Sequence, residues 1–257
     1  MTRVAGKHEL VDEPYLKPDF AAAEARLGQL LRGAPIPDTE LAENAGLFVS
    51  PRTVKRMFFL DEIYRHALPV HGIVMQYGLR WGRDLATFHA LRTIYEPFNA
   101  TRIIVGFDTF EGFPAVHASD GKAEMIKTGV LTVSEEYEGF LREVFAQRQI
   151  VDPLPQVRRF DVFKGDAPVR LQEYLETHPE TIVALAHFDM DLYEPTKRVL
   201  ELLRPHLTKG SILAFDELLS FVSPGETVAL REVFGLDRIR VRRSPTYSGH
   251  GSYVVVE

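Results

Sequence analysis

The chain reads Ala186-His187-Phe188-Asp189-Met190-Asp191-Leu192-Tyr193-Glu194-Pro195-Thr196 at the point where an apolar run leads directly into a helical pattern. The run before it, residues 182–188, is almost wholly apolar, as expected for a buried strand. The pattern after it, residues 194–207, carries Pro195 in its first turn, where the missing amide hydrogen costs no helical hydrogen bond. A strand that passes straight into a helix is typical of α/β folds.

The same alternation extends along the chain from His71 onward. The expected strands are residues 71–77, 101–107, 157–163, 182–188, 211–215, 238–241 and 252–256. Ser134 is expected to cap a helix that includes residues 137–145, Gly210 to follow the end of the helix at 194–207, and Gly235 to close a third helix at 226–234. The last two strands could pair as a hairpin through residues 243–251, which would give the sheet an antiparallel edge.

The N-terminal part of the chain has a different pattern. Residues 14–69 hold two or three helical stretches, interrupted by a Pro-rich segment at 33–37 and by Ser50-Pro51. We therefore expect residues 1–69 to form a helical cap, lid or oligomerisation segment, and residues 70–257 to form the catalytic domain.

Composition excludes several classes of protein. The 257 residues carry a formal net charge of −6, which argues against nonspecific electrostatic binding to nucleic acid or to an anionic membrane. Because cysteine is absent, disulfide frameworks, zinc-thiolate sites and cysteine nucleophiles are excluded. No stretch approaches the roughly 18 apolar residues of a membrane span, and the polar N-terminus lacks the apolar core of a signal peptide. We expect a cytoplasmic protein that acts on a small molecule.

Polar residues and glycines gather where the expected strands end. In an open parallel sheet these ends converge on the ligand site, because loops and helix N-termini meet there. Gly78 and Gly82 follow the first strand, and their spacing departs from the G-x-G-x-x-G pattern of dinucleotide-binding proteins. Asp108 ends the second strand, and its two carboxylate oxygens match a vicinal diol such as that of a ribose. Asp166 follows the third, where it could bind an exocyclic amine or cap the next helix.

Four carboxylates follow the next two strands. Asp189 and Asp191 come after the fourth strand, and Asp216 and Glu217 come after the fifth. Clustered carboxylates repel one another and raise one another's pKa unless a cation compensates. Oxygen ligands without cysteine favour a hard ion, so the cluster predicts Mg²⁺, with helix capping and surface charge as the alternative. Asp191 is left out of the ligand set, because capping explains it equally well.

These segments resemble the macrocin-type O-methyltransferases, bacterial enzymes that methylate sugar hydroxyls in antibiotic pathways. The resemblance covers residues from about 47 to the C-terminus. It is carried by Phe107-Asp108-Thr109-Phe110-Glu111-Gly112-Phe113-Pro114, His187-Phe188-Asp189-Met190-Asp191-Leu192-Tyr193-Glu194-Pro195-Thr196, Phe215-Asp216-Glu217 and Pro224-Gly225-Glu226-Thr227. It implies a class I methyltransferase fold, which is a Rossmann-like seven-stranded sheet with a reversed C-terminal hairpin. It also implies S-adenosylmethionine and Mg²⁺ as cofactors.

The resemblance assigns an acceptor and site residues as well. The acceptor would be a hydroxyl of a nucleotide-linked deoxysugar such as dTDP-rhamnose, or of another glycoside, and we expect a homo-oligomer. Asp189 would be the general base and a metal ligand, with Asp216 and Glu217 as further ligands. The cofactor set would be Gln76, Tyr77, Gly78, Trp81, Gly82, Asp108, Thr109, Phe110, Gly165, Asp166, Ala167 and Asp189. Gln76 stands where an acid is frequent in the family, and Glu217 stands where a second Asp is usual.

Other residues and functions stay open at this point. His187 is predicted as a second catalytic residue and His250 as an alternative base. A substrate diphosphate could be met by Arg80, Arg83, Lys164 and Arg243. One competing function is metal-dependent methylation of a catechol or phenol, and another is nonenzymatic binding of a nucleotide sugar. The lack of G-x-S-x-G and of G-x-x-x-x-G-K-[ST] excludes a serine hydrolase of the α/β type and a P-loop enzyme.

Overall fold

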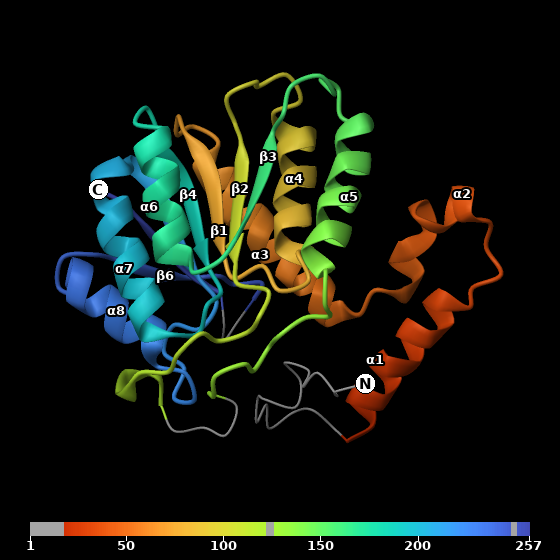
Figure 1. Cartoon of the computed structure of the whole chain (residues 1–257), viewed down its shortest axis with the longest axis horizontal. Coiled ribbons are helices and arrows are strands. Elements are labelled where there is room, and N and C mark those ends of the chain that lie inside the picture. Colours follow the sequence, from red (N-terminus) through yellow and green to blue (C-terminus); the bar gives the residue numbers. More distant parts are fainter. Residues whose placement is uncertain (1–17, 122–125, 248–250) are drawn as a thin grey trace.

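The computed structural model describes residues 18–121, 126–247 and 251–257, which form a seven-stranded sheet flanked by helices (Figure 1). The strands are β1 (Ile73–Tyr77), β2 (Ile104–Asp108), β3 (Phe160–Lys164), β4 (Val183–Phe188), β5 (Leu207–Phe215), β6 (Val241–Arg243) and β7 (Ser252–Val255). Their order across the sheet is β3-β2-β1-β4-β5-β7-β6. The first five are parallel, whereas β7 pairs antiparallel with both β5 and β6. The expected α/β class and the reversed hairpin are confirmed, and six of the expected strands coincide with observed ones. The strand expected at residues 238–241 is shifted, because β6 begins only at Val241.

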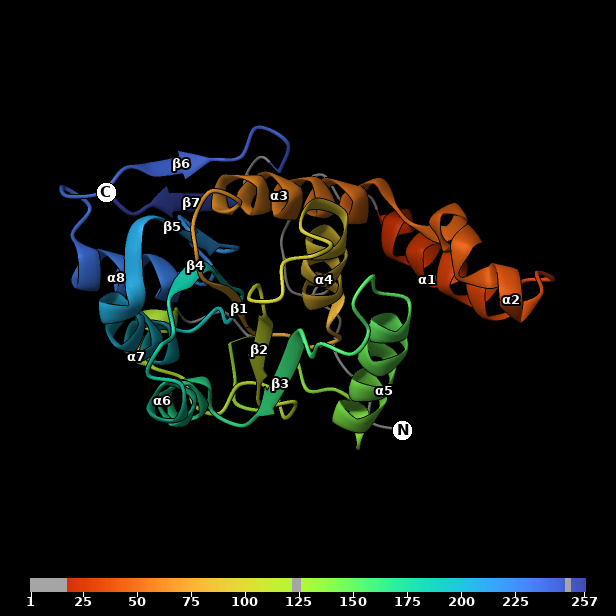
Figure 2. The same cartoon turned by 90° about the horizontal axis from the view of Figure 1, so that it is seen from above.

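Helices cover both faces of the sheet (Figure 2). One face carries α3 (Pro51–Ala67), α4 (Arg83–Tyr95) and α5 (Tyr137–Ile150), and the other carries α6 (Ala167–Thr177), α7 (Tyr193–Leu203) and α8 (Gly225–Phe234). Successive strand residues point to opposite faces, so Val74 belongs to the core under the first helix layer and Met75 to the core under the second. Both faces of the parallel strands are therefore buried, which is why these strands read as continuous apolar runs.

The N-terminal segment consists of short helices that lead into α3. These are α1 (Pro18–Arg32), α2 (Asp38–Leu41) and the 3-10 helix η2 (Glu43–Phe48). The side chain of Ser50 accepts a hydrogen bond from the amide of Thr53 and caps α3, and Pro51 occupies the first turn. The described helices do not include one with the length and apolar character needed to cross a membrane.

Helix α3 packs on the sheet through a stripe of buried side chains. The stripe comprises Arg56, Phe59, Leu60, Ile63, Tyr64 and Ala67. These positions repeat at the three- and four-residue spacing of one helical face. A fully buried cation is thus part of an otherwise apolar stripe, and it is the member of the stripe nearest the start of the helix. Its ion-pair partners lie at the carboxyl ends of β4 and β5 and in the first turn of α4, as described below.

Two helix boundaries differ from the sequence prediction. Ser134 does not cap α5, because Glu136 takes the capping position with a positive φ of 57° and the helix starts at Tyr137. Gly210 does not follow a helix end, because it lies inside β5. The helix stops earlier than predicted, at Leu203, since a 3-10 turn that contains a proline follows it (η4, Arg204–His206).

Candidate active site

A cavity of about 610 Å³ lies at the carboxyl ends of the parallel strands. It opens where the strand order reverses between β1 and β4, the usual ligand position in an open α/β sheet. Sheet register brings the site together, because Tyr77 pairs with Phe107 on one side and with Phe188 on the other, and Phe188 pairs with Phe215. The residues that follow these four are therefore level with one another. They are Gly78, Asp108, Asp189 and Asp216, and all four line the cavity.

The structure divides the predicted cofactor set. The cavity is lined by Gly78, Trp81, Asp108, Thr109, Gly165, Asp166, Ala167 and Asp189. Gln76, Tyr77, Gly82 and Phe110 are absent from its wall. The ring of Tyr77 is stacked between Phe107 and Phe188 at centroid distances of 5.1 and 5.2 Å. Gln76 is buried, and its amide donates to the carbonyl of Gly78. Tyr77 and Gln76 are residues of β1, so their side chains project into the layers between sheet and helices and not toward the cavity. They support the loop after β1 from inside the protein.

Gly78 allows the ends of two strands to touch. Its φ is +83°, and a Cβ at this position would lie 2.0 Å from the carbonyl oxygen of Asp189. The amide of Asp189 in turn donates to the carbonyl of Tyr77 at 2.9 Å. Only glycine combines this positive φ with such a close backbone approach. The turn thus fixes the position of Asp189 relative to the loop after β1.

Asp108 is held by the loop after β1. Its Oδ2 accepts hydrogen bonds from the amides of Leu79 and Arg80 at 2.6 and 2.7 Å, and its Oδ1 accepts from the amide of Phe110 at 2.5 Å. Burial raises the pKa of Asp108, and the backbone hydrogen bonds act in the opposite direction. Carboxylate oxygens can each accept more than one hydrogen bond, so a carboxylate fixed in this way can still receive a vicinal diol.

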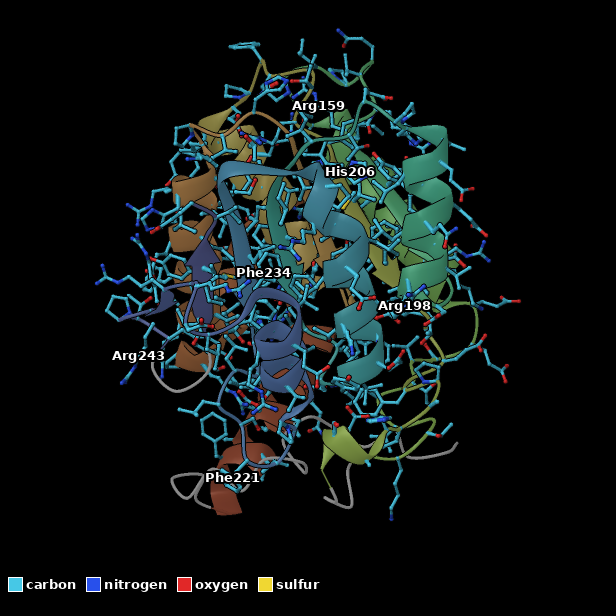
Figure 3. The ribbon with its side chains drawn as sticks, turned by 90° about the vertical axis from the view of Figure 1, so that its left-hand side faces the viewer. Arg159, Arg198, His206, Phe221, Phe234 and Arg243 are labelled. Atoms are coloured by element: carbon cyan, nitrogen blue, oxygen red, sulfur yellow. The ribbon has the colours of Figure 1, made fainter. Side chains whose placement is uncertain are left out.

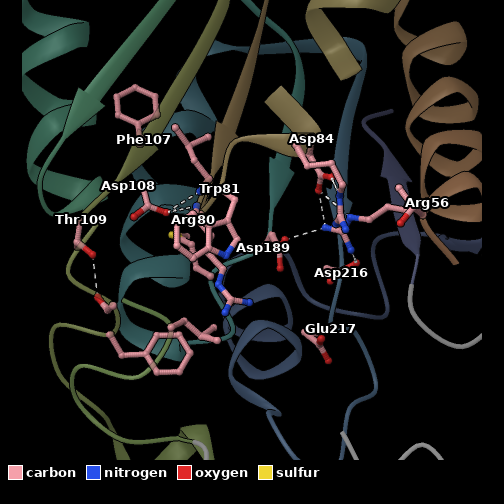
Figure 4. A pocket seen from close by; sticks show the side chains of 18 of the residues that line it. Arg56, Arg80, Trp81, Asp84, Phe107, Asp108, Thr109, Asp189, Asp216 and Glu217 are labelled. Atoms are coloured by element: carbon pink, nitrogen blue, oxygen red, sulfur yellow. Dashed lines mark hydrogen bonds and ion pairs between the residues drawn. The ribbon is translucent and has the colours of Figure 1, made fainter. Parts of the chain in front are cut away.

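Arg56 joins three carboxylates at the other side of the cavity (Figure 4). Its Nη2 lies 2.6 Å from Asp84 and 2.7 Å from Asp189, and its Nη1 lies 2.5 Å from Asp216. Burial opposes the charge of the guanidinium, but Asp216, Asp84 and Asp189 outweigh it and hold the pKa of Arg56 well above its ordinary value. Burial likewise works against ionisation of Asp84, but Arg56 and Arg83 lower its pKa well below its ordinary value.

Sequence reasoning missed both Arg56 and Asp84. The signal for Arg56 was available, since the arginine falls in helical register with Phe59, Leu60 and Ile63 and so had to face the sheet. Asp84 lies in the first turn of α4, where an acidic residue ordinarily reads as a favourable interaction with the helix dipole. Nothing in the local pattern indicates that both would meet the acids of β4 and β5.

The predicted magnesium ligands do not form a three-carboxylate set. Asp189 and Asp216 share the guanidinium of Arg56, whereas Glu217 lies apart from it (Figure 4). The hydroxyl of Ser223 donates to Glu217 at 3.4 Å. Within residues 18–121, 126–247 and 251–257, no group of three or more His, Asp or Glu side chains has the arrangement of a metal site. A divalent ion between Asp189 and Asp216 would have to displace Arg56, so the residues do not fit the metal as they stand.

A buried glutamate is hydrogen-bonded to the backbone that follows both β4 and β5. Glu226 is fully buried, and it accepts hydrogen bonds from the amides of Met190, Asp191 and Glu217. Burial raises its pKa well above the ordinary value, and the neighbouring acids add to the shift, with Asp191 the largest among them. Glu226 belongs to the Pro224-Gly225-Glu226-Thr227 segment, to which the sequence assigned no role. Its position explains why this segment accompanies the acidic strand ends.

The predicted histidine after β4 is not placed at the cavity. His187 is fully buried and packs edge-on against Phe59 and Phe88, and it is not part of the cavity wall. Burial lowers its pKa, which favours the neutral ring. We therefore assign His187 no proton transfer, in contrast to the sequence prediction. His250 lies outside the described residues.

The four predicted cations separate into two groups. Arg80 and Arg83 line the cavity. Lys164 instead pairs with Glu111 at 3.3 Å, and Arg243 lies on the outer edge strand β6 (Figure 3). Arg52 from the first turn of α3 also lines the cavity and was not predicted.

Known structures resemble the chain over nearly its whole length. The structure of CalS11, a calicheamicin methyltransferase, is 42% identical, with a TM-score of 0.90 over 94% of both chains. The chain belongs to the macrocin-type O-methyltransferase family. The apo structure of CalS11, described as a TDP-rhamnose 3'-O-methyltransferase, is 40% identical, with a TM-score of 0.82 over 94% of this chain and 96% of that one.

A more distant structure supports the fold of this family member. The O-methyltransferase NovP is 21% identical, with a TM-score of 0.61 over 79% of this chain and 80% of that one. The class I methyltransferase fold and the sequence resemblance are thus confirmed. No family profile and no curated protein matches the chain.

Proposed function

We propose that this methyltransferase transfers the methyl group of S-adenosylmethionine to a hydroxyl of a TDP-linked deoxyhexose, as a step in the biosynthesis of an antibiotic or related natural product. The observation that carries the proposal is the 42% identity over 94% of the chain with the calicheamicin methyltransferase CalS11. CalS11 is described as a TDP-rhamnose 3'-O-methyltransferase. The cavity residues described above agree with this chemistry. The predicted homo-oligomer and the division at residue 69 stay predictions.

The residues present fit S-adenosylmethionine. When bound, this cofactor supplies a methyl group on a positively charged sulfur. Gly78 lines the cavity beside the loop after β1, and Asp108 would accept hydrogen bonds from the ribose hydroxyls. Asp166 lines the cavity beside Gly165 and would receive the amine of the adenine. Burial raises the pKa of Asp166, which fits a carboxyl group that interacts with a neutral base.

Asp189 is the proposed general base. Its side chain is 11% exposed, it lines the cavity, and its Oδ2 is bound by Arg56. A sugar hydroxyl is a weak nucleophile at neutral pH, so methyl transfer needs an oriented oxygen and a group that takes its proton. The ion pair with Arg56 orients the carboxylate for this step. Because the residues do not fit a divalent ion while Arg56 is in place, the proposed mechanism assigns no role to Mg²⁺.

The cavity wall also offers partners for a nucleotide sugar. Arg52, Arg80 and Arg83 lie in this wall together with the acids, and a substrate diphosphate would pair with such cations. Leu27 and Leu31 of α1 line the cavity as well, so the N-terminal segment contributes directly to the cavity wall. A nucleotide sugar has both an anionic diphosphate and apolar ring faces, and this wall offers partners for each.

An acceptor screen tests the proposal. The purified chain is incubated with S-adenosylmethionine labelled with ¹³C in the methyl group and with TDP-rhamnose, other TDP-deoxyhexoses, free glycosides or catechols. We expect a new methyl ether signal with one or more TDP-deoxyhexoses. Methylation of catechols alone would support the phenol alternative. If the chain binds nucleotide sugars but transfers no methyl group to any acceptor, it is a nonenzymatic binding protein.

A further inference from the structure

The site holds an arginine in the position where the family resemblance implies a metal ion. The three carboxylates around Arg56 come from three different elements, since Asp84 lies on α4, Asp189 follows β4 and Asp216 follows β5. The guanidinium is 5% exposed, and its ion-pair distances lie between 2.5 and 2.7 Å. Such charge-assisted pairs are among the strong interactions of a protein interior.

Further arginines contribute positive charge to the cluster. Asp84 is also bound by Arg83 at 2.8 Å, and the charge of Asp189 counteracts the burial that lowers the pKa of Arg80. Removal of one partner from a buried ion pair is strongly destabilising, because the other charge is left without compensation. Displacement of Arg56 by a metal would therefore be opposed by its own buried charge.

The backbone also holds Arg56 in place. The side chain belongs to the buried stripe of α3, whose other members, such as Phe59 and Leu60, are fully buried against the sheet. The helix start is fixed by the Ser50 cap and by Pro51. Withdrawal of the guanidinium would need either a shift of the whole helix or a new buried position for the charge.

We propose that Arg56 takes the place of the divalent cation in this enzyme, so that it positions Asp189 and Asp216 and makes methyl transfer independent of metal. The proposal rests on the proposed function for its activity readout. An arginine can orient carboxylates and neutralise their charge, but it cannot coordinate two sugar hydroxyls as a metal does. Removal of the acceptor proton therefore depends on Asp189, to which the proton passes as the oxygen–methyl bond forms and the methyl–sulfur bond breaks.

The first test needs no variant. Mn²⁺ binding to the intact chain is measured by electron paramagnetic resonance after treatment with EDTA, and methyl transfer is measured with EDTA and with added Mg²⁺. We expect no stoichiometric Mn²⁺ binding and rates that agree within about twofold, because the guanidinium already compensates the carboxylates. Stoichiometric Mn²⁺ binding, or activity that EDTA abolishes and Mg²⁺ restores, would overturn the proposal. The Mn²⁺ measurement needs no acceptor, so it stands even if the proposed acceptor is wrong.

The second test replaces the side chain. Arg56→Met should lower kcat by about 100-fold or more, as expected for loss of the group that positions a general base. The KM for S-adenosylmethionine should change much less than kcat, because Arg56 lies across the cavity from Asp108. Arg56→Lys keeps the charge and should recover part of kcat. The matched control is Arg65→Met on the same helix, whose side chain is 58% exposed and pairs with Asp61. An Arg56→Met enzyme that folds and keeps wild-type kcat would overturn the assignment.

Discussion

Gly78 provides the sharpest test of how the fold builds the site. Substitution by alanine would force a side chain into a backbone conformation with φ of +83° and would place its Cβ 2.0 Å from the carbonyl oxygen of Asp189. The positive φ alone costs about 1 to 2 kcal/mol for a residue with a Cβ. The contact is with backbone, so the two strand ends must separate, which costs a further 1 to 3 kcal/mol, roughly the cost of overpacking a core.

Gly129→Ala is the matched control. Its φ is +80°, almost the same as that of Gly78, but a Cβ there would meet nothing within 4 Å. The control therefore carries the conformational cost alone. We expect Gly129→Ala to lower the free energy of unfolding by about 1 kcal/mol and Gly78→Ala to lower it by about 3 kcal/mol.

Urea unfolding measures the two stabilities, and calorimetry measures the affinity for S-adenosylmethionine. Gly78→Ala should also weaken cofactor binding by about 10-fold or more, because a shift of the loop after β1 moves the amides that hold Asp108. Gly129→Ala should bind the cofactor normally. Equal stabilities of the two variants would refute the close approach between Gly78 and Asp189.

Two further substitutions probe the cofactor site and the core. Asp108→Asn should raise the Kd for S-adenosylmethionine by about 10-fold or more, because an amide has only one acceptor oxygen; calorimetry should show no change for Asp161→Asn, which lies outside the cavity wall. Burial, aided by Arg148, lowers the pKa of His89 from 6.5 to about 4. The stability that this ring contributes is fully present above pH 6.5 and is lost as the pH falls towards 4, by up to about 3 kcal/mol. Urea unfolding of His89→Leu should lack this part of the acid dependence, and an unchanged pH dependence would contradict the assignment.

The sequence predicted the fold well, because the fold depends on local patterns. Apolar runs, glycines after helices and the spacing of the last two strands gave the parallel sheet with its reversed hairpin. Errors arose where a local signal had two outcomes. A glycine such as Gly210 can end a helix or adopt a positive φ within a strand. Because the proline-containing 3-10 turn ends α7 earlier, Gly210 lies inside β5, where its φ is +92°.

Strand ends also predicted half of the site. Asp108 and Asp189 were recognisable, because a polar residue directly after a buried strand is placed at the ligand edge by the topology. Tyr77 is predicted as a cofactor residue as well, but its ring packs between Phe107 and Phe188 inside the sheet layer. Asp108 is likewise the last residue of its strand yet lines the cavity, so the side to which a strand-end side chain projects decides between contact and support.

The other half depends on tertiary packing that no local pattern reveals. Arg56 is separated by 28 residues from Asp84, by 133 from Asp189 and by 160 from Asp216. The four groups meet only because α3 packs against β4 and β5 through the buried face that carries Arg56. The acids after β4 and β5 therefore predict a metal site, since no local pattern in the sequence indicates their cationic partner.

The central claim is that this cavity performs methyl transfer with Asp189 as the base. The direct measurement compares the single-turnover rate of Asp189→Asn with that of the wild type, at saturating S-adenosylmethionine and TDP-deoxyhexose. We predict a rate at least about 100-fold lower in the variant, since an amide cannot accept the hydroxyl proton. Cofactor affinity measured by calorimetry should stay near the wild-type value. A variant that binds the cofactor and transfers the methyl group at the wild-type rate would contradict the account.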